Sequence, residues 1–261
     1  MTKSSALKFS KFRPNELQEV CRLLSSVFQT SPDKLTELYV QLDSTLEDAG
    51  WPPHFVSRDF FCTRDGHFQS VYEQSPAIAV DLPSLLELSD GVQEKPTIVL
   101  LGQDPKSNQS YDRISLGTPY GLHHKGSREQ LTNTKLYFKM IQVLMELGYR
   151  VYLTDIFKVW ICNPQRLYSG MTLPKADRDK FLDILEAELD IMNPTAVVTW
   201  GKPSARSIKD LEVDLHLEFP HPSGAANKAW KELLGGQSPT HANKLAYWES
   251  SVNQVLCHRS A

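Results

Sequence analysis

Three side chains that could take part in catalysis stand just beyond separate short apolar runs in this chain. They are Asp104, Asp155 and His221. A carboxylate can orient a water molecule and stabilise developing positive charge, and a histidine can donate a hydrogen bond to a departing anion. A carboxylate with a histidine therefore suits the hydrolysis of a bond between a sugar and a base. In that reaction positive charge develops on the sugar and negative charge on the base, and no metal or cofactor is required.

Each of these residues also has a structural interpretation. Asp104 stands between Gly-Gln and Pro, where an aspartate often bonds to nearby backbone amides in a turn. His221 lies between two prolines and could belong to a rigid turn. Asp155 follows an apolar run and could cap a helix or pair with a cation. A shared catalytic role requires that the fold bring these residues to the same edge of a sheet.

The elements that must position these residues alternate between strand and helix from Thr97 onward. Short apolar runs predict strands, and apolar residues at helical spacing predict amphipathic helices. Such an alternation indicates a parallel sheet with helices on both faces, whose strand ends share one rim. The predicted strands are 97–101, 151–154, 196–200 and 215–219, and the predicted helices are 129–147, 174–192, one that begins at Pro203, and 241–256.

The first third of the chain has a different character. Residues 14–50 have helical patterning, whereas residues 51–95 look irregular, with a short helix over the leucines between 82 and 88. We therefore predict an α/β fold: a single domain with a central four-stranded parallel sheet flanked by helices on both faces. Residues 1–90 would form an N-terminal helical or irregular extension packed on the core, and residues 91–261 the α/β domain proper.

Composition limits the remaining possibilities. The net charge of the 261 residues is −3, so any binding of nucleic acid must depend on local basic patches. The four cysteines are far apart in the sequence, which favours free thiols in a reducing compartment. We found no apolar run long enough to cross a membrane. We therefore expect an intracellular protein, cytoplasmic or nuclear, that is a monomer and has no metal site.

Three short motifs resemble the uracil-DNA glycosylase superfamily. They are Gly102-Gln103-Asp104-Pro105, Thr199-Trp200-Gly201 and His221-Pro222-Ser223, and the resemblance extends from about Thr97 to His241. It implies a monofunctional DNA glycosylase of base excision repair, with no cofactor and with single- or double-stranded DNA as its partner. Such an enzyme flips deoxyuridine, or a related deaminated or modified nucleotide, out of the DNA and cleaves its N-glycosidic bond.

The resemblance also implies roles for individual residues. Asp104 matches the catalytic aspartate that orients water, and His221 matches the histidine that stabilises the leaving base. Gln103 would contact the base. The residues that would grip the DNA backbone are Pro105, Pro222 and Ser223.

Two positions depart from the family pattern. Lys106 and Ser107 replace the tyrosine and histidine that follow Gln-Asp-Pro in the uracil-specific branch, so Lys106 could contact a phosphate instead. Asp155 stands where the family usually has a base-reading asparagine. An ionised Asp155 would accept from N3–H of uracil but face O4 with like polarity. It could instead accept from the amine of cytosine, or it could be protonated.

Further contacts to DNA would have to come from residues outside the three motifs. The loop after His221 has no leucine to fill the gap left by a flipped base, so Asn227 or Trp230 would have to do so. Tyr120 is our first candidate for stacking on the base, with His123 or His124 as the second. Two basic groups could follow the phosphates: His123, His124, Lys125 and Arg128 in the first, and Lys228, Lys231 and Lys244 in the second.

Two functions remain open from the sequence. The first is the DNA glycosylase described above. The second is a protein that kept the fold but is catalytically weak or inactive, and that binds DNA, a nucleotide or another protein. Asp104 and His221 favour the enzyme, whereas Lys106, Asp155 and the missing leucine favour the binding protein.

Overall fold

The fold is described from a computed structural model of the 261-residue chain. Tyr120 and His124, both candidates for stacking on the base, lie outside the described residues. The structure describes residues 6–9, 11–28, 30–44, 46, 55–56, 75, 78–89, 94–106, 114–117, 121–123, 125–130, 132–163 and 165–256.

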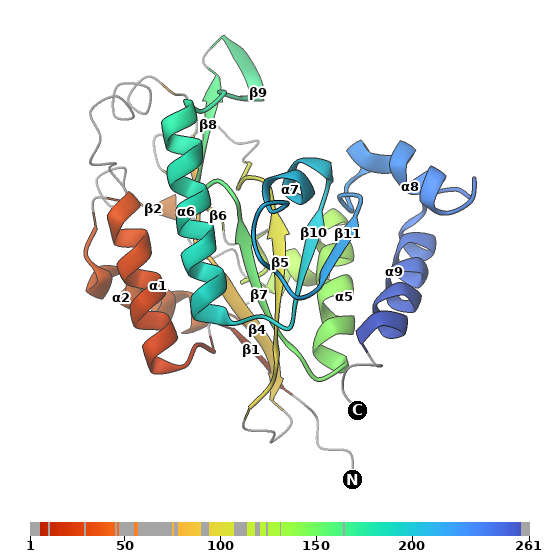
Figure 1. The fold of residues 1–261 in the computed structure, drawn as a ribbon, viewed down its shortest axis with the longest axis horizontal. Helices are drawn as coiled ribbons and strands as arrows, with labels where there is room; N and C mark the ends of the chain where they lie inside the picture. Colours follow the sequence, from red (N-terminus) through yellow and green to blue (C-terminus); the bar gives the residue numbers. More distant parts are fainter. Residues whose placement is uncertain are drawn as a thin grey trace.

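A six-stranded sheet lies at the centre of the molecule, in the order β1–β4–β7–β5–β10–β11 (Figure 1). Its parallel strands β7, β5, β10 and β11 are the four that the sequence predicts, so the predicted fold class is confirmed. β4 and β1 add two antiparallel strands beyond β7. The bounds are β1 Ala6–Phe9, β4 Ser84–Ser89, β7 Arg150–Asp155, β5 Thr97–Gly102, β10 Ala196–Trp200 and β11 His216–Phe219.

A second, five-stranded sheet has the order β2–β6–β3–β8–β9 and was not expected from the sequence. β3 leads directly into β4, and β8 follows β7 after three residues, so both connections join the second sheet to the first. β8 and β9 pair as an antiparallel hairpin. The bounds are β2 Phe55–Val56, β6 Ile114–Gly117, β3 Ile78–Asp81, β8 Val159–Asn163 and β9 Arg166–Gly170.

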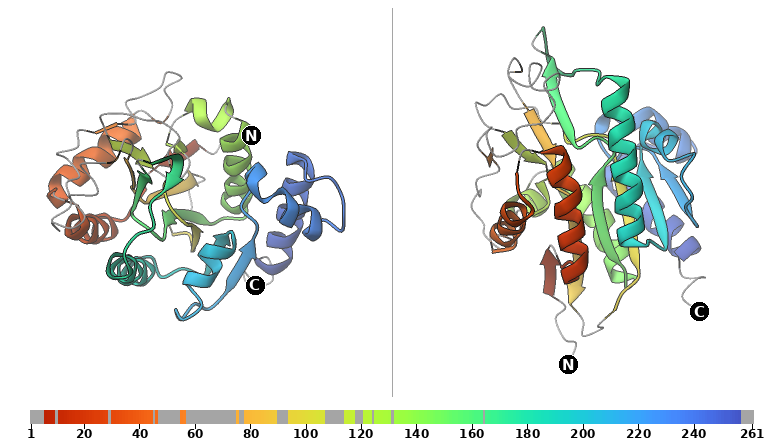
Figure 2. Two further views of the ribbon diagram at one scale, coloured as in Figure 1. Left: turned by 90° about the horizontal axis from the view of Figure 1, so that it is seen from above. Right: turned by 60° about the vertical axis from the view of Figure 1, so that its left-hand side comes forward.

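Helices cover both faces of the central sheet. α1, α2 and α6 lie on one side of it, and α5 and α9 pack together on the other (Figures 1 and 2). The shorter α7 and α8 follow the carboxyl ends of β10 and β11. The bounds are α1 Pro14–Val27, α2 Pro32–Ser44, α4 Lys125–Glu129, α5 Thr132–Glu146, α6 Lys175–Met192, α7 Lys202–Ser207, α8 Asn227–Leu233 and α9 His241–Leu256.

The short helix expected between residues 82 and 88 is wrong, because this segment is strand β4. Leu85 and Leu86 point to opposite faces of the sheet, and both are fully buried because helices cover both faces (Figure 1). The segment is held as a strand by its pairing with β1 and with β7. Tertiary pairing thus overrides a spacing that is equally compatible with a helix. The proposed division of the chain at residue 90 stays a prediction.

One apolar core joins the first third of the chain to the rest. Buried side chains from α1 and α2 belong to the same cluster as those of the parallel strands and of α9. Glu16 of α1 forms a buried ion pair with Arg150 at the start of β7, which fixes this helix to the sheet. None of the described helices is long and apolar enough to cross a membrane.

Candidate functional site

Asp104 lies two residues beyond the end of β5, where the parallel strands have their carboxyl ends. The loop that carries it is held by two backbone hydrogen bonds from the segment after β7. Ile156 N–H donates to Gly102 O at 3.2 Å, and Phe157 N–H donates to Gln103 O at 3.0 Å. Gly102 is also the register partner of Asp155. The sheet therefore fixes Asp104 and Asp155 on neighbouring strand ends.

The Asp104 side chain is half-buried, and the nearest groups affect its pKa in opposite directions. Burial raises the pKa of this carboxyl group, because the charged form loses hydration. The Lys106 ammonium lowers the pKa, as does the hydrogen bond of 3.1 Å that Gln103 Nε2 donates to Asp104 Oδ2. Gln103, Asp104 and Lys106 therefore lie together just beyond the carboxyl end of β5.

A cavity of about 470 Å³ opens beside Asp104. Gln103 and Lys106 line it next to the carboxylate. The other lining residues come from the segment after β7, from the β8–β9 hairpin and from the segment that leads into the start of α6, and they mix apolar side chains such as Phe157 and Trp160 with Arg178. His221 and Asp155, both described, are not among its lining residues.

The residues that β8 and β9 contribute to this cavity were not expected from the sequence. The apolar run Val159–Cys162 was a usable signal for another strand. The lone Lys158 before it was a signal for a buried ion pair, because a charge within an apolar segment needs a partner.

His221 follows β11, and the preceding Trp200-Gly201 motif shapes its surroundings. Gly201 has a φ of +99°, which favours glycine, and a Cβ added there would meet Cβ of His221 at 3.8 Å. The His221 ring packs edge-on against Trp200 and against Tyr137 of α5, with ring centroids 6.3 and 5.6 Å away. The motif therefore turns the chain tightly enough to seat the histidine against aromatic rings.

Ser223 sets the tautomer of His221. The backbone N–H of Ser223 donates to His221 Nδ1 at 3.2 Å, and Ser223 Oγ lies 2.8 Å from the same nitrogen. Burial lowers the pKa of the ring to about 4, and the nearby Lys244 ammonium acts in the same direction. The imidazole is therefore neutral near neutral pH. Because Nδ1 accepts a hydrogen bond, its proton is on Nε2.

Two expectations for the loop after His221 are wrong. Trp230 is fully buried and its indole N–H donates to His221 O at 2.9 Å, so it cannot fill a gap in DNA. Lys244 is also buried, and its ammonium donates to Pro222 O at 2.9 Å and to Asn227 Oδ1 at 2.8 Å. Lys244 therefore anchors the loop and does not follow the phosphates.

The first basic group is also mainly structural. His123 is fully buried, and its ring packs near that of Phe9. Arg128 is buried and donates to the backbone carbonyls of Leu122 and Leu46 at 2.9 and 2.7 Å. These two side chains join segments of the fold, so neither of them contributes to the predicted phosphate-binding patch.

The residues proposed to contact the DNA backbone differ in their exposure. Lys106 is exposed beside the cavity, whereas Pro105 is buried. Pro222 is likewise buried, and Ser223 is half-buried with its hydroxyl beside Nδ1 of His221. Asn227 and Lys228 are exposed at the start of α8.

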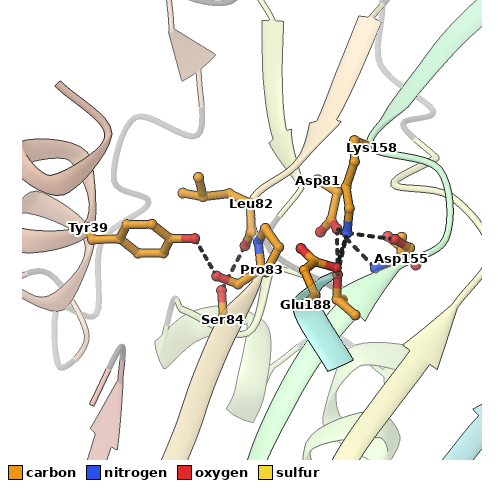
Figure 3. Close-up of polar contacts among 9 residues, drawn as sticks. Tyr39, Asp81, Leu82, Pro83, Ser84, Asp155, Lys158 and Glu188 are labelled. Atoms are coloured by element: carbon orange, nitrogen blue, oxygen red, sulfur yellow. Dashed lines mark hydrogen bonds and ion pairs between the residues drawn. The ribbon is translucent and has the colours of Figure 1, made fainter. Parts of the chain in front are cut away.

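Asp155 is 3% exposed and lies beside a buried ionic cluster of Asp81, Lys158 and Glu188 (Figure 3). Lys158 Nζ lies 3.0 Å from Asp81 Oδ2 and 2.7 Å from Glu188 Oε2. The backbone N–H of Asp155 donates to Asp81 Oδ2 at 2.9 Å. This ionic cluster connects β3, α6 and the segment after β7. Among the described residues, no three His, Cys, Asp or Glu side chains are arranged to hold a metal ion.

Comparison with known protein families places the chain in one of them. The model of the uracil DNA glycosylase superfamily matches residues 89–250, which is more than half of the 261-residue chain. No curated protein sequence matches the chain. The matched segment begins within β4 and contains Asp104, Asp155 and His221, whereas Asp81 precedes it.

Proposed function

The chain belongs to the uracil-DNA glycosylase superfamily, and from that premise we propose that it hydrolyses the N-glycosidic bond of uracil, or of a related deaminated or modified base, in DNA. The family points to a DNA glycosylase type of function. The observation that carries the specific proposal is the position of Asp104, which lines a cavity at the carboxyl end of β5. The neutral His221 follows β11 at the same edge of the sheet.

Asp104 is proposed to act on the sugar side of the bond. As a carboxylate it accepts a hydrogen bond from the attacking water and stabilises the positive charge that develops on the sugar. Burial makes this stabilisation stronger, because few water molecules screen the charge. The nearby Lys106 ammonium favours the ionised form that this role requires.

His221 is proposed to act on the base side of the bond. Its neutral ring can donate from Nε2–H to the uracil O2 as negative charge builds up on the departing base. Ser223 holds the tautomer that leaves this proton on Nε2. A neutral donor serves here because the hydrogen bond strengthens as the oxygen becomes anionic, without a full proton transfer.

The base pocket is proposed to combine polar and aromatic contacts. Gln103 lies next to Asp104 and can hydrogen-bond the base, and Asp155 is the candidate base reader on the neighbouring strand end. Phe157 lines the cavity and offers an aromatic ring for stacking. Tyr120 stays a proposed stacking residue.

DNA, single- or double-stranded, is the proposed partner. Lys106, Asn227 and Lys228 are exposed and can reach phosphates or the gap left by a flipped base, while Ser223 can add a hydroxyl contact. Pro105 and Pro222 are proposed to shape the loops that contact the DNA backbone. We propose that the protein acts as a monomer in base excision repair.

The test uses labelled single- and double-stranded oligonucleotides that contain uracil, hypoxanthine, xanthine or a 5-substituted uracil. Alkali converts each abasic site into a strand break. We expect breaks with the unmodified protein, a loss of about a hundredfold or more with Asp104→Asn, and no loss with the control Asp179→Asn. Asp179 is an exposed residue of α6, so it tests for general effects of the substitution. Binding without breaks on every substrate would instead support a catalytically inactive protein.

A further inference from the structure

Asp155 is a buried carboxyl group with no hydrogen-bond partner for its side chain within the described part of the chain. Its hydrogen bonds there come from its backbone: N–H donates to Asp81 Oδ2, and its carbonyl oxygen accepts from Lys158 Nζ at 2.9 Å. In the described part of the chain, Asp81 Oδ1 and Glu188 Oε1 are completely buried without a hydrogen-bond partner, whereas neither carboxyl oxygen of Asp155 is among such atoms. The unpartnered Asp155 carboxyl group, on the strand end next to the Asp104 loop, is therefore available to a ligand.

The charges around Asp155 come from four elements. Asp81 at the end of β3, Asp104 after β5 and Glu188 on α6 are acidic, and Lys158 after β7 is the cation. The ammonium of Lys158 already contacts Asp81 Oδ2, Glu188 Oε2, Thr154 Oγ1 and the Asp155 carbonyl oxygen. One cation that is occupied in this way cannot balance all of these carboxylates. The arrangement therefore favours a proton on one of them.

We propose that Asp155 is a neutral carboxylic acid in the folded protein and that it reads a base edge with an N–H donor beside a carbonyl acceptor, as in N3–H and O4 of uracil. This inference rests on the proposed glycosylase function. A protonated Asp155 would take the place of the asparagine of the family pattern, because a carboxylic acid has one donor and one acceptor in a similar forked geometry.

The protonation state decides which bases fit. A carboxylate offers only acceptors, so it would attract N3–H but repel O4. A carboxylic acid can accept from N3–H through its C=O and donate to O4 through its O–H, which satisfies both groups. Uracil, hypoxanthine and xanthine all present such a lactam edge. The proposed ligand class is therefore a base with a lactam edge, flipped out of the DNA.

The surroundings of Asp155 agree with this assignment. Burial raises the pKa of its carboxyl group well above the ordinary value, the negative charges of Asp81 and Asp104 raise it further, and Lys158 opposes them only in part. The donor O–H disappears when the pH passes this pKa. Excision of uracil should therefore fall on the alkaline side, whereas an amide at the same position does not titrate.

The first test observes the proton directly and needs no activity. Difference infrared spectra of the unmodified protein and Asp155→Asn are recorded in the absence of DNA. We expect the C=O stretching band of a protonated carboxylic acid at neutral pH, lost in the variant and lost on alkaline titration. Carboxylate bands in its place would overturn the inference, even if uracil is excised, and the proposed function would then stand without it.

The second test measures recognition without cleavage. The probe is an oligonucleotide with a 2′-fluorinated deoxyuridine, which resists hydrolysis, and its counterpart carries a methyl group on N3. We expect the unmodified protein to bind the N3–H form about ten- to a hundredfold more tightly, as two good base contacts allow. Asp155→Asn should keep this preference at alkaline pH, where the unmodified protein loses it.

Two results would count against the reading role. Equal binding of both oligonucleotides would show that Asp155 does not contact the base edge. The same alkaline loss in Asp155→Asn would assign the titration to another group, including the base itself. Failure of the proposed function has a different signature, namely no abasic sites with any substrate although the N3–H preference is present.

Discussion

The backbone N–H of Asp155 donates a hydrogen bond of 2.9 Å to Oδ2 of Asp81. Asp81 ends β3, before the segment that matches the superfamily, and Asp155 ends β7 inside it. The first third of the chain therefore contributes directly to the geometry of the candidate site. Lys158 strengthens the connection, because it contacts Asp81 and Glu188 at once.

Removing the cation of this cluster should destabilise the protein strongly. We expect Lys158→Met to lower the free energy of unfolding by about 3–5 kcal/mol, because Asp81 and Glu188 would remain buried without their cation. Lys158 is fully buried, so solvent cannot compensate for the loss. Denaturant unfolding near neutral pH measures this difference.

The matched control for this prediction is Lys175→Met. Lys175 pairs with Asp179 at 2.5 Å on the surface of α6, with 81% of its side chain exposed. An exposed pair of this kind contributes about 0.5 kcal/mol or less. Similar losses in both variants would contradict the central role that we assign to the buried cluster.

The parallel part of the fold could be predicted because it depends on local patterns. Ala196–Trp200 is apolar except for Thr199 and is bounded by turn residues, and the structure has the strand with these same bounds. β4 could not be assigned with the same security, since the spacing of its leucines also fits a helix and its pairing partners are distant in the sequence. β4 pairs with β7 across more than 60 residues, for example Leu86 with Val151.

In the candidate site, too, some features could be predicted from the sequence and others could not. Asp104 and His221 could be placed at one sheet edge from the order of strands alone. The burial of Trp230 and Lys244 could not be predicted, because their side chains turn inward to hold the loop after His221. A basic or aromatic residue near a motif is thus a weak indication of contact with DNA, since the same residue types serve as internal anchors.

The low pKa of His221 predicts a loss of stability in acid. The folded protein holds this ring neutral down to about 4, whereas the unfolded chain takes up a proton near 6.5. The contribution of the neutral His221 ring to the free energy of unfolding is therefore complete above the pKa of the unfolded chain. It is lost as the pH falls from 6.5 to about 4. We expect His221→Gln to flatten the pH dependence of the free energy of unfolding in this window. His241→Gln, at an exposed position on α9, should leave the dependence as it is.

Lys106 should set the acid limit of activity through Asp104. Its ammonium lowers the pKa of the Asp104 carboxyl group, which burial raises. We expect Lys106→Gln to move the acid limb of kcat/KM for uracil excision to higher pH, while Lys106→Arg keeps the limb in place. An acid limb that is the same in all three proteins would mean that Asp104 does not control it.

Phe157 should contribute to base binding through its ring. We expect Phe157→Ala to lower uracil excision about ten- to a hundredfold, since stacking contributes about 1–3 kcal/mol per base. Phe157→Tyr keeps the ring and should retain most activity. Phe157 also packs near the ring of Phe181, at 6.3 Å between centroids, so thermal unfolding of both variants must be compared. Excision that is reduced only in proportion to the unfolded fraction would assign Phe157 to the core alone.

Lys228 should contact a phosphate without reading sequence. It is exposed at the start of α8, close to the loop that follows His221. Each phosphate that a lysine neutralises adds about 0.9 to the slope of log affinity against log salt concentration for duplex DNA. We therefore expect Lys228→Gln to weaken the binding of uracil-containing and uracil-free duplexes alike, and to reduce this slope by about 0.9. Lys34→Gln, on α2 at the other side of the molecule (Figure 1), should change neither quantity. Binding that weakens equally in both variants would indicate a general effect of net charge, and Lys228 would then have no phosphate of its own.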